Sequence, residues 1–451
     1  MKNITIIGGG ASGTLLAANL LKNANCELTI NIVEKRGKLG QGVAYSTPHL
    51  VHLLNVPAAK MGAFPDDVGD FHKWLTANGF DHSESDFVPR SIFGKYLTNI
   101  LSRSVDAAAD SVKFNYFDDE AEEFADGENS AVVILASGQI IHSDIVVLAF
   151  GNFLPPHPNV PDDGYTSEPK YFRDQWQSTV FTNIDVNNSI LIIGTGLSMV
   201  DLAMHFNTTG HIGKISAIST RGLLPAVHAH GEAYPSFYSE LKGMDRITDL
   251  LKVVRRHIKR AESDGGNWRG VIDSLRPHTQ QIWSDLPTAE KKYFMEHLSR
   301  YWNVSRHRMP KQAADVLEDM QANEKLEVFG GRLLTIEPAD GKFITTYRSD
   351  GIDKTVTTDA VINCIGSQSN FQRIDSPLIK NLINSGSIKN DELSLGIAVD
   401  KKYCVVGADG KTSQKIRTLG TSMKGTLWET TAIPEIRHQA KELALQLLGE
   451  L

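Results

Sequence analysis

ITIIGGGASG, residues 4–13, joins a short β-branched run to a cluster of glycines. Residues 4–7 predict a buried strand, because β-branched side chains suit a sheet that is covered on both faces. Residues 11–22 predict a helix in which Leu16 and Leu20 lie one turn apart. LTINIV, residues 28–33, predicts a second strand. The order strand, glycine turn, helix, strand is typical of a parallel βαβ unit.

The glycines of this turn have the spacing that a bound dinucleotide requires. In a βαβ unit the first glycine permits the tight turn, the second lets a pyrophosphate approach the backbone, and the third lets the helix pack on the strand. The helix N-terminus then attracts the anion, and a carboxylate at the end of the second strand accepts hydrogen bonds from a ribose. The candidate residues of this site are Gly8, Gly10, Ser12, Gly13, Glu34 and Lys35.

LIIGTGLSMVD, residues 191–201, predicts a second loop of the same kind. Gly194 and Gly196 keep the two roles nearest the pyrophosphate, and Ser198 is a further candidate contact. Met199 replaces the packing glycine, and we expect its flexible side chain to fill the gap that results. Asp201 is expected to point sideways, since its charge would repel a phosphate brought too close. Two loops suggest two dinucleotides whose reactive rings meet.

The strand after the second loop ends in ISTRG, residues 217–222, and carries no acid there. Arg221 stands instead at a position suited to a 2′-phosphate, which predicts NADPH rather than NADH. The alternative is a surface arginine in a turn.

Composition narrows the class of protein. The chain has 451 residues, of which 41% are apolar and 22% charged, which suits two or three globular domains. A net charge of −7 argues against nucleic acid as a partner. Three distant cysteines predict no disulfide framework, dithiol or metal cluster, and fit a reducing cytoplasm. We find no signal peptide and no apolar run long enough for a membrane span.

The rest of the chain alternates between strand and helix patterns. Strands are predicted at 132–138, 145–151, 325–330, 342–348 and 359–366, and 152–164 reads as a proline-rich linker. Residues 232–325 are helical in character, with an apolar stripe through Leu250 and Val254 beside basic residues that we interpret as a solvated face. PEIRHQAKELALQLL predicts a final amphipathic helix packed on the body of the protein.

Several stretches resemble the FAD/NAD(P)-binding flavoproteins and, within them, a bacterial group related to flavin-containing and N-hydroxylating monooxygenases. They are GGGASG (8–13), GQGVAYSTP (40–48), HLLNVPAAKMGAFPDD (52–67), VPRSIFGKYL (88–97), TRGLLP (220–225), WNVSRHRMP (302–310) and GTLWETTAIPEIRHQA (425–440). The resemblance covers nearly the whole chain and is specific for cofactor rather than for substrate.

The resemblance implies an α/β fold with two Rossmann-like dinucleotide-binding domains and a helical insertion. A discontinuous FAD domain would occupy 1–165 and 346–451, and an inserted NADPH domain would occupy 185–345, with the helices at about 232–325. FAD would lie on the first loop, with Gly42 and the segment from Asn55 to Met61 along its ring system. Gly151 in LAFGN would lie beside the dinucleotide. Thr430 and Thr431 would flank a helix directed at the flavin.

Residues for the substrate are less sharply indicated. Arg306 and Arg308 in RHRMP suit a carboxylate-bearing substrate, and the alternative is a structural ion-pair cluster. His228 and His230 are candidates for a proton relay or for plain loop histidines. Arg90 is a candidate contact to cofactor or substrate. Asn55 is a candidate at the flavin edge, because an amide both donates and accepts.

Our main hypothesis is an FAD-dependent, NADPH-using oxidoreductase, specifically a monooxygenase that passes one oxygen atom from O2 to a nitrogen or other heteroatom of a small substrate. The oxygenation step follows from the family resemblance alone. One alternative is a flavin reductase or oxidase with another electron acceptor. The other, from a different class, is a non-catalytic nucleotide-binding sensor or scaffold.

Overall fold

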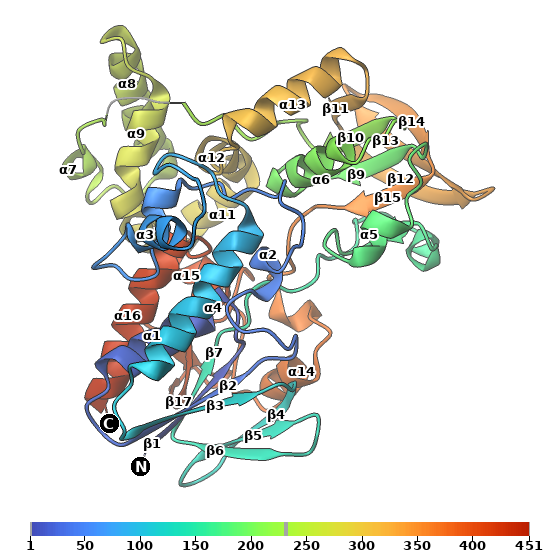
Figure 1. Cartoon of the computed structure of the whole chain (residues 1–451). Coiled ribbons are helices and arrows are strands. Elements are labelled where there is room, and N and C mark those ends of the chain that lie inside the picture. Colours follow the sequence, from blue (N-terminus) through green and yellow to red (C-terminus); the bar gives the residue numbers. More distant parts are fainter. Residues whose placement is uncertain (1, 230–232, 451) are drawn as a thin grey trace.

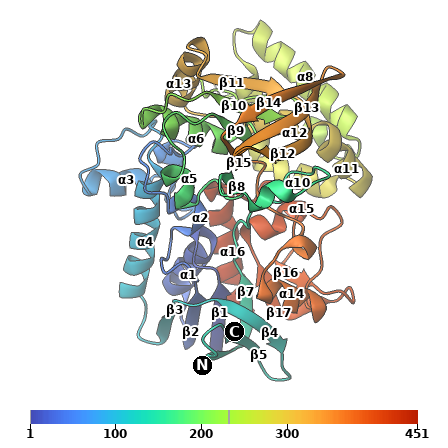
Figure 2. The ribbon, with the colours of Figure 1, turned by 90° about the vertical axis from the view of Figure 1, so that its right-hand side faces the viewer.

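The computed structural model of the chain describes residues 2–229 and 233–450. Figure 1 shows a lower body, an upper body and a group of helices beside the upper one. We call the lower body the first unit, the upper body the second unit, and the helices between residues 238 and 306 the helical group. Figure 2 shows the same arrangement from the side, with the second unit above the first. The two ends of the chain lie close together at the foot of the first unit.

The first unit is built on the predicted βαβ element. Strand β1 (Lys2–Ile7) pairs in parallel with β2 (Leu28–Val33), and α1 (Ala11–Asn23) connects them. The strand, helix and strand predicted at 4–7, 11–22 and 28–33 are therefore confirmed. The sheet continues in the order β16 (Cys404–Val406), β17 (Thr412–Thr418), β7 (Ile145–Leu148), β1, β2 and β3 (Val112–Phe117).

Both faces of this sheet are covered, so β2 and β7 are buried along their whole length, including the polar residues Thr29 and Asn31 of β2. One face packs on three helices: α1, α4 (Arg90–Asp106) and α16 (Ile433–Glu450). The other packs on α14 (Pro377–Asn384) and on an antiparallel sheet of β4 (Ala121–Asp126), β5 (Ala131–Leu135) and β6 (Ile140–Ser143). Helix α16 buries Ala440, Leu443 and Leu447 against the body, as predicted. The short helices α2 (Gly42–Tyr45) and α3 (Asp70–Ala77) complete this unit.

The second unit repeats the plan. Strand β9 (Ile190–Ile193), helix α6 (Leu197–Thr208) and strand β10 (Ile215–Ser219) form another parallel βαβ element. Its sheet has the order β11 (Leu326–Gly330), β10, β9, β15 (Ala360–Asn363) and β8 (Tyr171–Phe172). A meander of β12 (Arg332–Ala339), β13 (Lys342–Ser349) and β14 (Ile352–Thr358) packs on one face, and α5 (Ser178–Thr182) follows β8.

Both expected boundaries of this unit need correction. Strand β15 pairs with β9, so the chain returns to the first unit after Asn363 and not at 346. Strand β8 pairs with β15, so the second sheet begins before 185. Strand β15 lies within the strand predicted at 359–366, and only the unit it belongs to was assigned wrongly, whereas the two-residue strand β8 was not predicted.

The helical group has a core of its own, separate from the two sheets. It contains α7 (Tyr238–Leu241), α8 (Ile247–Ser263), α9 (Trp268–Leu275), α10 (Thr279–Asp285), α11 (Thr288–His297) and α12 (Ser299–Arg306). The basic residues of α8 are exposed, as the solvated-face interpretation requires. The next helix, α13 (Lys311–Ala322), packs against α6, so the last part of the expected insertion belongs to the second unit. Within the described residues, every helix is too short or too polar to cross a membrane.

Candidate functional site

The first glycine loop has the geometry that its spacing predicts. Gly8 has a φ of +108°, and a Cβ there would lie 2.3 Å from the carbonyl oxygen of Ala149. A Cβ on Gly13 would lie 1.9 Å from the oxygen of Gly8, so this glycine allows α1 to meet β1. Gly10 precedes α1 and provides no side-chain cap. The start of α1 is thus shaped for an anion.

Glu34 directly follows β2 and is buried. Its Oε2 accepts a hydrogen bond from the Gly9 N–H at 2.9 Å, and its Oε1 accepts one from the Arg36 N–H at 2.9 Å. Each carboxylate oxygen retains a second lone pair for a ligand hydroxyl. Lys35 instead pairs with Glu120 at 2.7 Å on the surface.

The remaining residues assigned to the first site lie at different depths. A Cβ on Gly42 would come within 3.2 Å of the Gly10 Cα, so these two backbones face each other closely. Gly151 has a φ of +68° and open space where a side chain would be. Met61 is buried in the core of the first unit, so its side chain serves packing.

The second loop matches the first in its turn and differs in its third position. Gly194 has a φ of +115°, and a Cβ there would lie 2.3 Å from the oxygen of Cys364 on the neighbouring strand. Gly196 is exposed, with nothing within 4 Å of its Cβ position. Met199 is fully buried among the side chains of the second core, which confirms that it fills the space beside α6.

A cleft of about 1720 Å³ opens beside the second loop. The walls come from the second loop, the segments 55–60 and 84–87 of the first unit, helix α12, and the segment 428–435 before and into α16. The predicted residues among its lining are Asn55, Gly194, Gly196, Ser198, Arg221, His228, Arg306, Arg308, Thr430 and Thr431. Residues from both units and from the helical group therefore share one cavity.

The first loop does not line this cleft, and the turn at Gly420 links it to Thr430, which does. A Cβ on Gly420 would lie 2.7 Å from the Ser12 Oγ, so the turn touches the first loop. The Thr430 hydroxyl donates to the Gly420 oxygen at 2.9 Å. Thr430 is buried and Thr431 is exposed, and both directly precede α16. A dinucleotide that extends from the first loop past Ser12 would thus approach the cleft near these threonines.

Arg221 is held beside the second loop by its own turn. The Thr195 hydroxyl donates to the Leu223 oxygen at 2.6 Å, which fixes the residues after β10 against the loop. The Arg221 side chain is exposed in the cleft. Arg332, at the start of β12, also lines the cleft and was not predicted from sequence.

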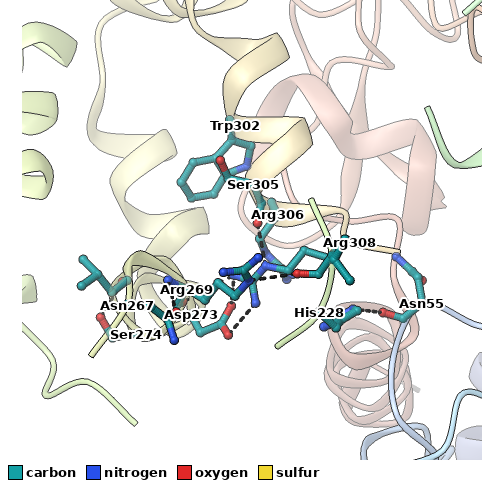
Figure 3. Close-up of polar contacts among 12 residues, drawn as sticks. Asn55, His228, Asn267, Arg269, Asp273, Ser274, Trp302, Ser305, Arg306 and Arg308 are labelled. Atoms are coloured by element: carbon teal, nitrogen blue, oxygen red, sulfur yellow. Dashed lines mark hydrogen bonds and ion pairs between the residues drawn. The ribbon is translucent and has the colours of Figure 1, made fainter. Parts of the chain in front are cut away.

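His228 contacts Asn55 across the cleft (Figure 3). The His228 Nε2 lies 3.0 Å from the Asn55 carbonyl oxygen, and since that oxygen only accepts, Nε2 carries the hydrogen. Burial lowers the pKa of His228, so the ring is neutral at pH 7. His230 lies outside the described residues.

Both arginines of RHRMP are engaged by carboxylates of the protein. Arg308 binds Asp273 with two hydrogen bonds of 2.9 Å, as Figure 3 shows. Arg306 binds the buried Glu429 at 3.0 Å. The interpretation of this motif as a structural ion-pair cluster therefore fits better than the alternative, in which unpaired guanidinium groups bind a substrate carboxylate.

Arg90 is absent from the cleft lining and pairs instead with Asp201 of α6 at 2.7 Å. Sequence reasoning missed the cleft residues Glu429, Glu435, Arg276 and Lys424. The first three belong to ion pairs between segments far apart in the sequence, for which no local pattern exists. Among the described residues we find no group of three or more potential metal ligands.

Three comparisons place this geometry among known proteins. A family model described as FAD-NAD(P)-binding matches residues 5–153, which hold the first loop and end before the second. No curated protein matches the sequence.

Solved structures resemble the chain over its whole length. The ornithine N-hydroxylase KtzI of Kutzneria sp. 744 has a TM-score of 0.65 and 14% identity, over 100% of this chain and 99% of that chain. The L-lysine 6-monooxygenase of Pseudomonas syringae has a TM-score of 0.66 and 14% identity, over 100% and 99%. The thioredoxin reductase of Lactococcus lactis has a TM-score of 0.53 and 11% identity, over 100% of both chains. At these identities the likeness shows the fold, and it confirms the predicted fold class of two dinucleotide-binding domains.

Proposed function

We propose that the chain is an FAD-dependent, NADPH-using monooxygenase that hydroxylates a nitrogen of a small amine substrate. One observation carries the proposal: the cleft joins the second glycine loop to the threonines that the Gly420 turn links to the first loop. Two dinucleotides held in this way would bring their redox rings into one cavity. The flavin-dependent hydroxylases of ornithine and lysine resemble the chain over its full length, which supports this choice.

The residues present fit both cofactors. Gly8, Gly10, Gly13 and Glu34 would hold the pyrophosphate and ribose of FAD, and the backbone before α16 would face the flavin. Bound FAD supplies the hydride acceptor and the ring at which O2 is activated. Gly194, Gly196 and Ser198 would hold the pyrophosphate of NADPH. The neutral His228 keeps the Asn55 carbonyl fixed at the edge of the cleft.

We further propose that the amine substrate carries a carboxylate group. Of the cleft cations, Arg276, Arg306 and Arg308 each hold a protein carboxylate. Lys424 also lines the cleft, and among the described residues no carboxylate pairs with it; its Nζ lies 5.4 Å from the centre of the Trp428 ring. It is less exposed than Lys60, Arg221 and Arg332, which line the cleft as well. Burial lowers the pKa of Lys424, which an anion would counteract. An amino acid substrate would therefore place its carboxylate at Lys424.

The three cysteines are free, and a reducing cytoplasm suits them.

The function is tested by NADPH oxidation in air across a panel of amines, each with and without a carboxylate. We expect purified protein to be yellow, NADPH to bleach it under nitrogen, and the carboxylate-bearing amine of one pair to yield a hydroxylamine. Hydrogen peroxide formed in equal amount to the NADPH consumed, with every substrate, would support an oxidase instead. Colourless protein that stays colourless with added FAD would support the scaffold.

The choice of nucleotide rests on Arg221. Replacing Arg221 by alanine should raise the Kd for NADPH about tenfold to a hundredfold, because a charged hydrogen bond contributes about 1.5–3 kcal/mol. The Kd for NADH should stay nearly constant. Arg255→Ala, on the exposed face of α8, serves as the control for a lost surface charge. Titration of both nucleotides measures the effect, and equal weakening of both would contradict the assignment.

A further inference from the structure

Arg90 connects the two units at a point outside the cleft. It is the first residue of α4, and its Nε donates to the Leu53 oxygen at 3.0 Å within the first unit. Its Nη2 lies 2.7 Å from the Oδ2 of Asp201 in the second unit. The exposed fractions of the two side chains are 15% and 8%. The ring of Trp176, between β8 and α5 of the second unit, lies 5.5 Å from the guanidinium.

Asp201 belongs to α6, the helix that begins at the second glycine loop. Burial raises the pKa of Asp201 to about 6, and Arg90 counteracts part of that effect. A buried carboxylate of this kind is stable only while its cation stays in place. The pair therefore resists any rotation of α6 away from α4.

A second contact between the units lies one helical turn further along α6, at His205. His205 packs edge-on against His49 of the first unit at 4.3 Å and against Phe181 at 4.4 Å between ring centroids. His52, fully buried, lies next to these rings. Burial lowers the pKa of His205 to about 4 and of His52 to about 3, so both are neutral packing groups at pH 7.

We propose that Arg90 and Asp201 form an interdomain clasp that positions α6, and with it the nicotinamide end of NADPH, relative to the first unit. The proposal rests on the proposed function, because it concerns hydride transfer from NADPH to FAD. The glycine loop that would bind the pyrophosphate precedes α6, and Asp201 is the fifth residue of that helix. We expect the loop to keep its shape in the clasp variants, because its turn is set by the close approach of Gly194 to the Cys364 oxygen. Binding and transfer should therefore separate, since a misplacement of about 1 Å can cost a hundredfold in rate.

The test measures flavin reduction by NADPH under nitrogen in a stopped-flow instrument, using FAD-loaded wild type, Asp201→Asn, Arg90→Lys and Arg90→Met/Asp201→Asn. We expect the reduction rate at saturating NADPH to fall about tenfold or more in Asp201→Asn and in the double variant. The Kd for NADPH should change by less than about threefold. Arg90→Lys should lose less of the rate than the other two variants, because it keeps the positive charge next to Asp201.

Arg417→Met is the matched control, since it breaks a 2.9 Å ion pair with Glu450 inside the first unit. Its reduction rate should equal that of the wild type. A clasp variant reduced at the wild-type rate, or a control that slows equally, would overturn the clasp. Wild type that binds FAD and is not reduced by NADPH would overturn the proposed function instead. Thermal unfolding of each variant shows whether an effect on rate follows stability.

Discussion

A Gly194→Ala variant is expected to purify yellow with bound FAD and to lose reduction by NADPH. The new Cβ would meet the Cys364 oxygen at 2.3 Å, and the residue would keep a φ of +115° that only glycine adopts freely. Neither β9 nor β15 can move apart without losing backbone hydrogen bonds, because the two strands are paired inside the second sheet. The turn must shift, and the N–H groups that would hold the pyrophosphate shift with it. We expect the reduction efficiency to fall about a hundredfold, the equivalent of about 2.7 kcal/mol.

Two further glycine variants distinguish the effect of the positive φ from the effect of the steric clash of the added Cβ. Gly210→Ala has a similar positive φ of +76° and nothing within 4 Å of its Cβ, so it should be reduced normally. Gly13→Ala places a Cβ 1.9 Å from the Gly8 oxygen in the first loop and should yield colourless protein. Absorbance spectra report bound FAD, and anaerobic mixing with NADPH reports reduction. Normal reduction of Gly194→Ala would remove the second loop from the nucleotide site.

The fold could be predicted where the signal is local. Gly8, Gly13 and Gly194 each stand where the backbone has no room for a side chain, so a short motif identifies them. Met199 was also predictable, because a missing glycine next to a packed helix leaves a gap of known position. Strand β8 was missed because two residues carry no period, whereas β15 was predicted as a strand and was assigned to the wrong unit, because its partner β9 lies far away in the sequence.

The candidate site shows the same limit. Arg306 and Arg308 were singled out correctly as a cluster, but their partners come from Glu429 and Asp273, which are distant in the sequence. Arg90 was expected near a ligand for the same reason: the sequence shows a charged residue in a stretch that resembles a flavoprotein family, and does not show the Asp201 carboxylate that pairs with it. Pairing between distant charges is a property of the folded chain.

Arg306→Met is expected to destabilise the protein by about 3–5 kcal/mol, the usual cost of leaving a buried charge unpaired. Glu429 is 8% exposed and receives hydrogen bonds from Arg306 at 3.0 Å and from the Trp302 ring nitrogen at 3.2 Å. This pair attaches the helical group to the segment before α16. Its loss should loosen the wall of the cleft as well as lower the free energy of unfolding.

The decrease in the free energy of unfolding of Arg306→Met should depend on pH in a definite direction. Burial raises the pKa of Glu429, and Arg306 lowers it, so removing Arg306 raises it further. The folded variant then holds a proton at a pH where the unfolded chain has released it, and folding is favoured as the pH falls. The deficit relative to wild type should therefore be smaller at pH 5 than at pH 8. Urea unfolding followed by tryptophan fluorescence at both pH values measures it.

The double variant Arg306→Met/Glu429→Gln distinguishes an unpaired charge from lost packing. It removes the buried carboxylate together with its cation, so most of the stability should return and the added pH dependence should disappear. Arg276 and Glu435 remain paired at 2.7 Å in both variants and keep the rest of the wall in place. A double variant as unstable as Arg306→Met at pH 8 would show that the apolar contacts of the arginine, and not its charge, hold the helical group to the first unit.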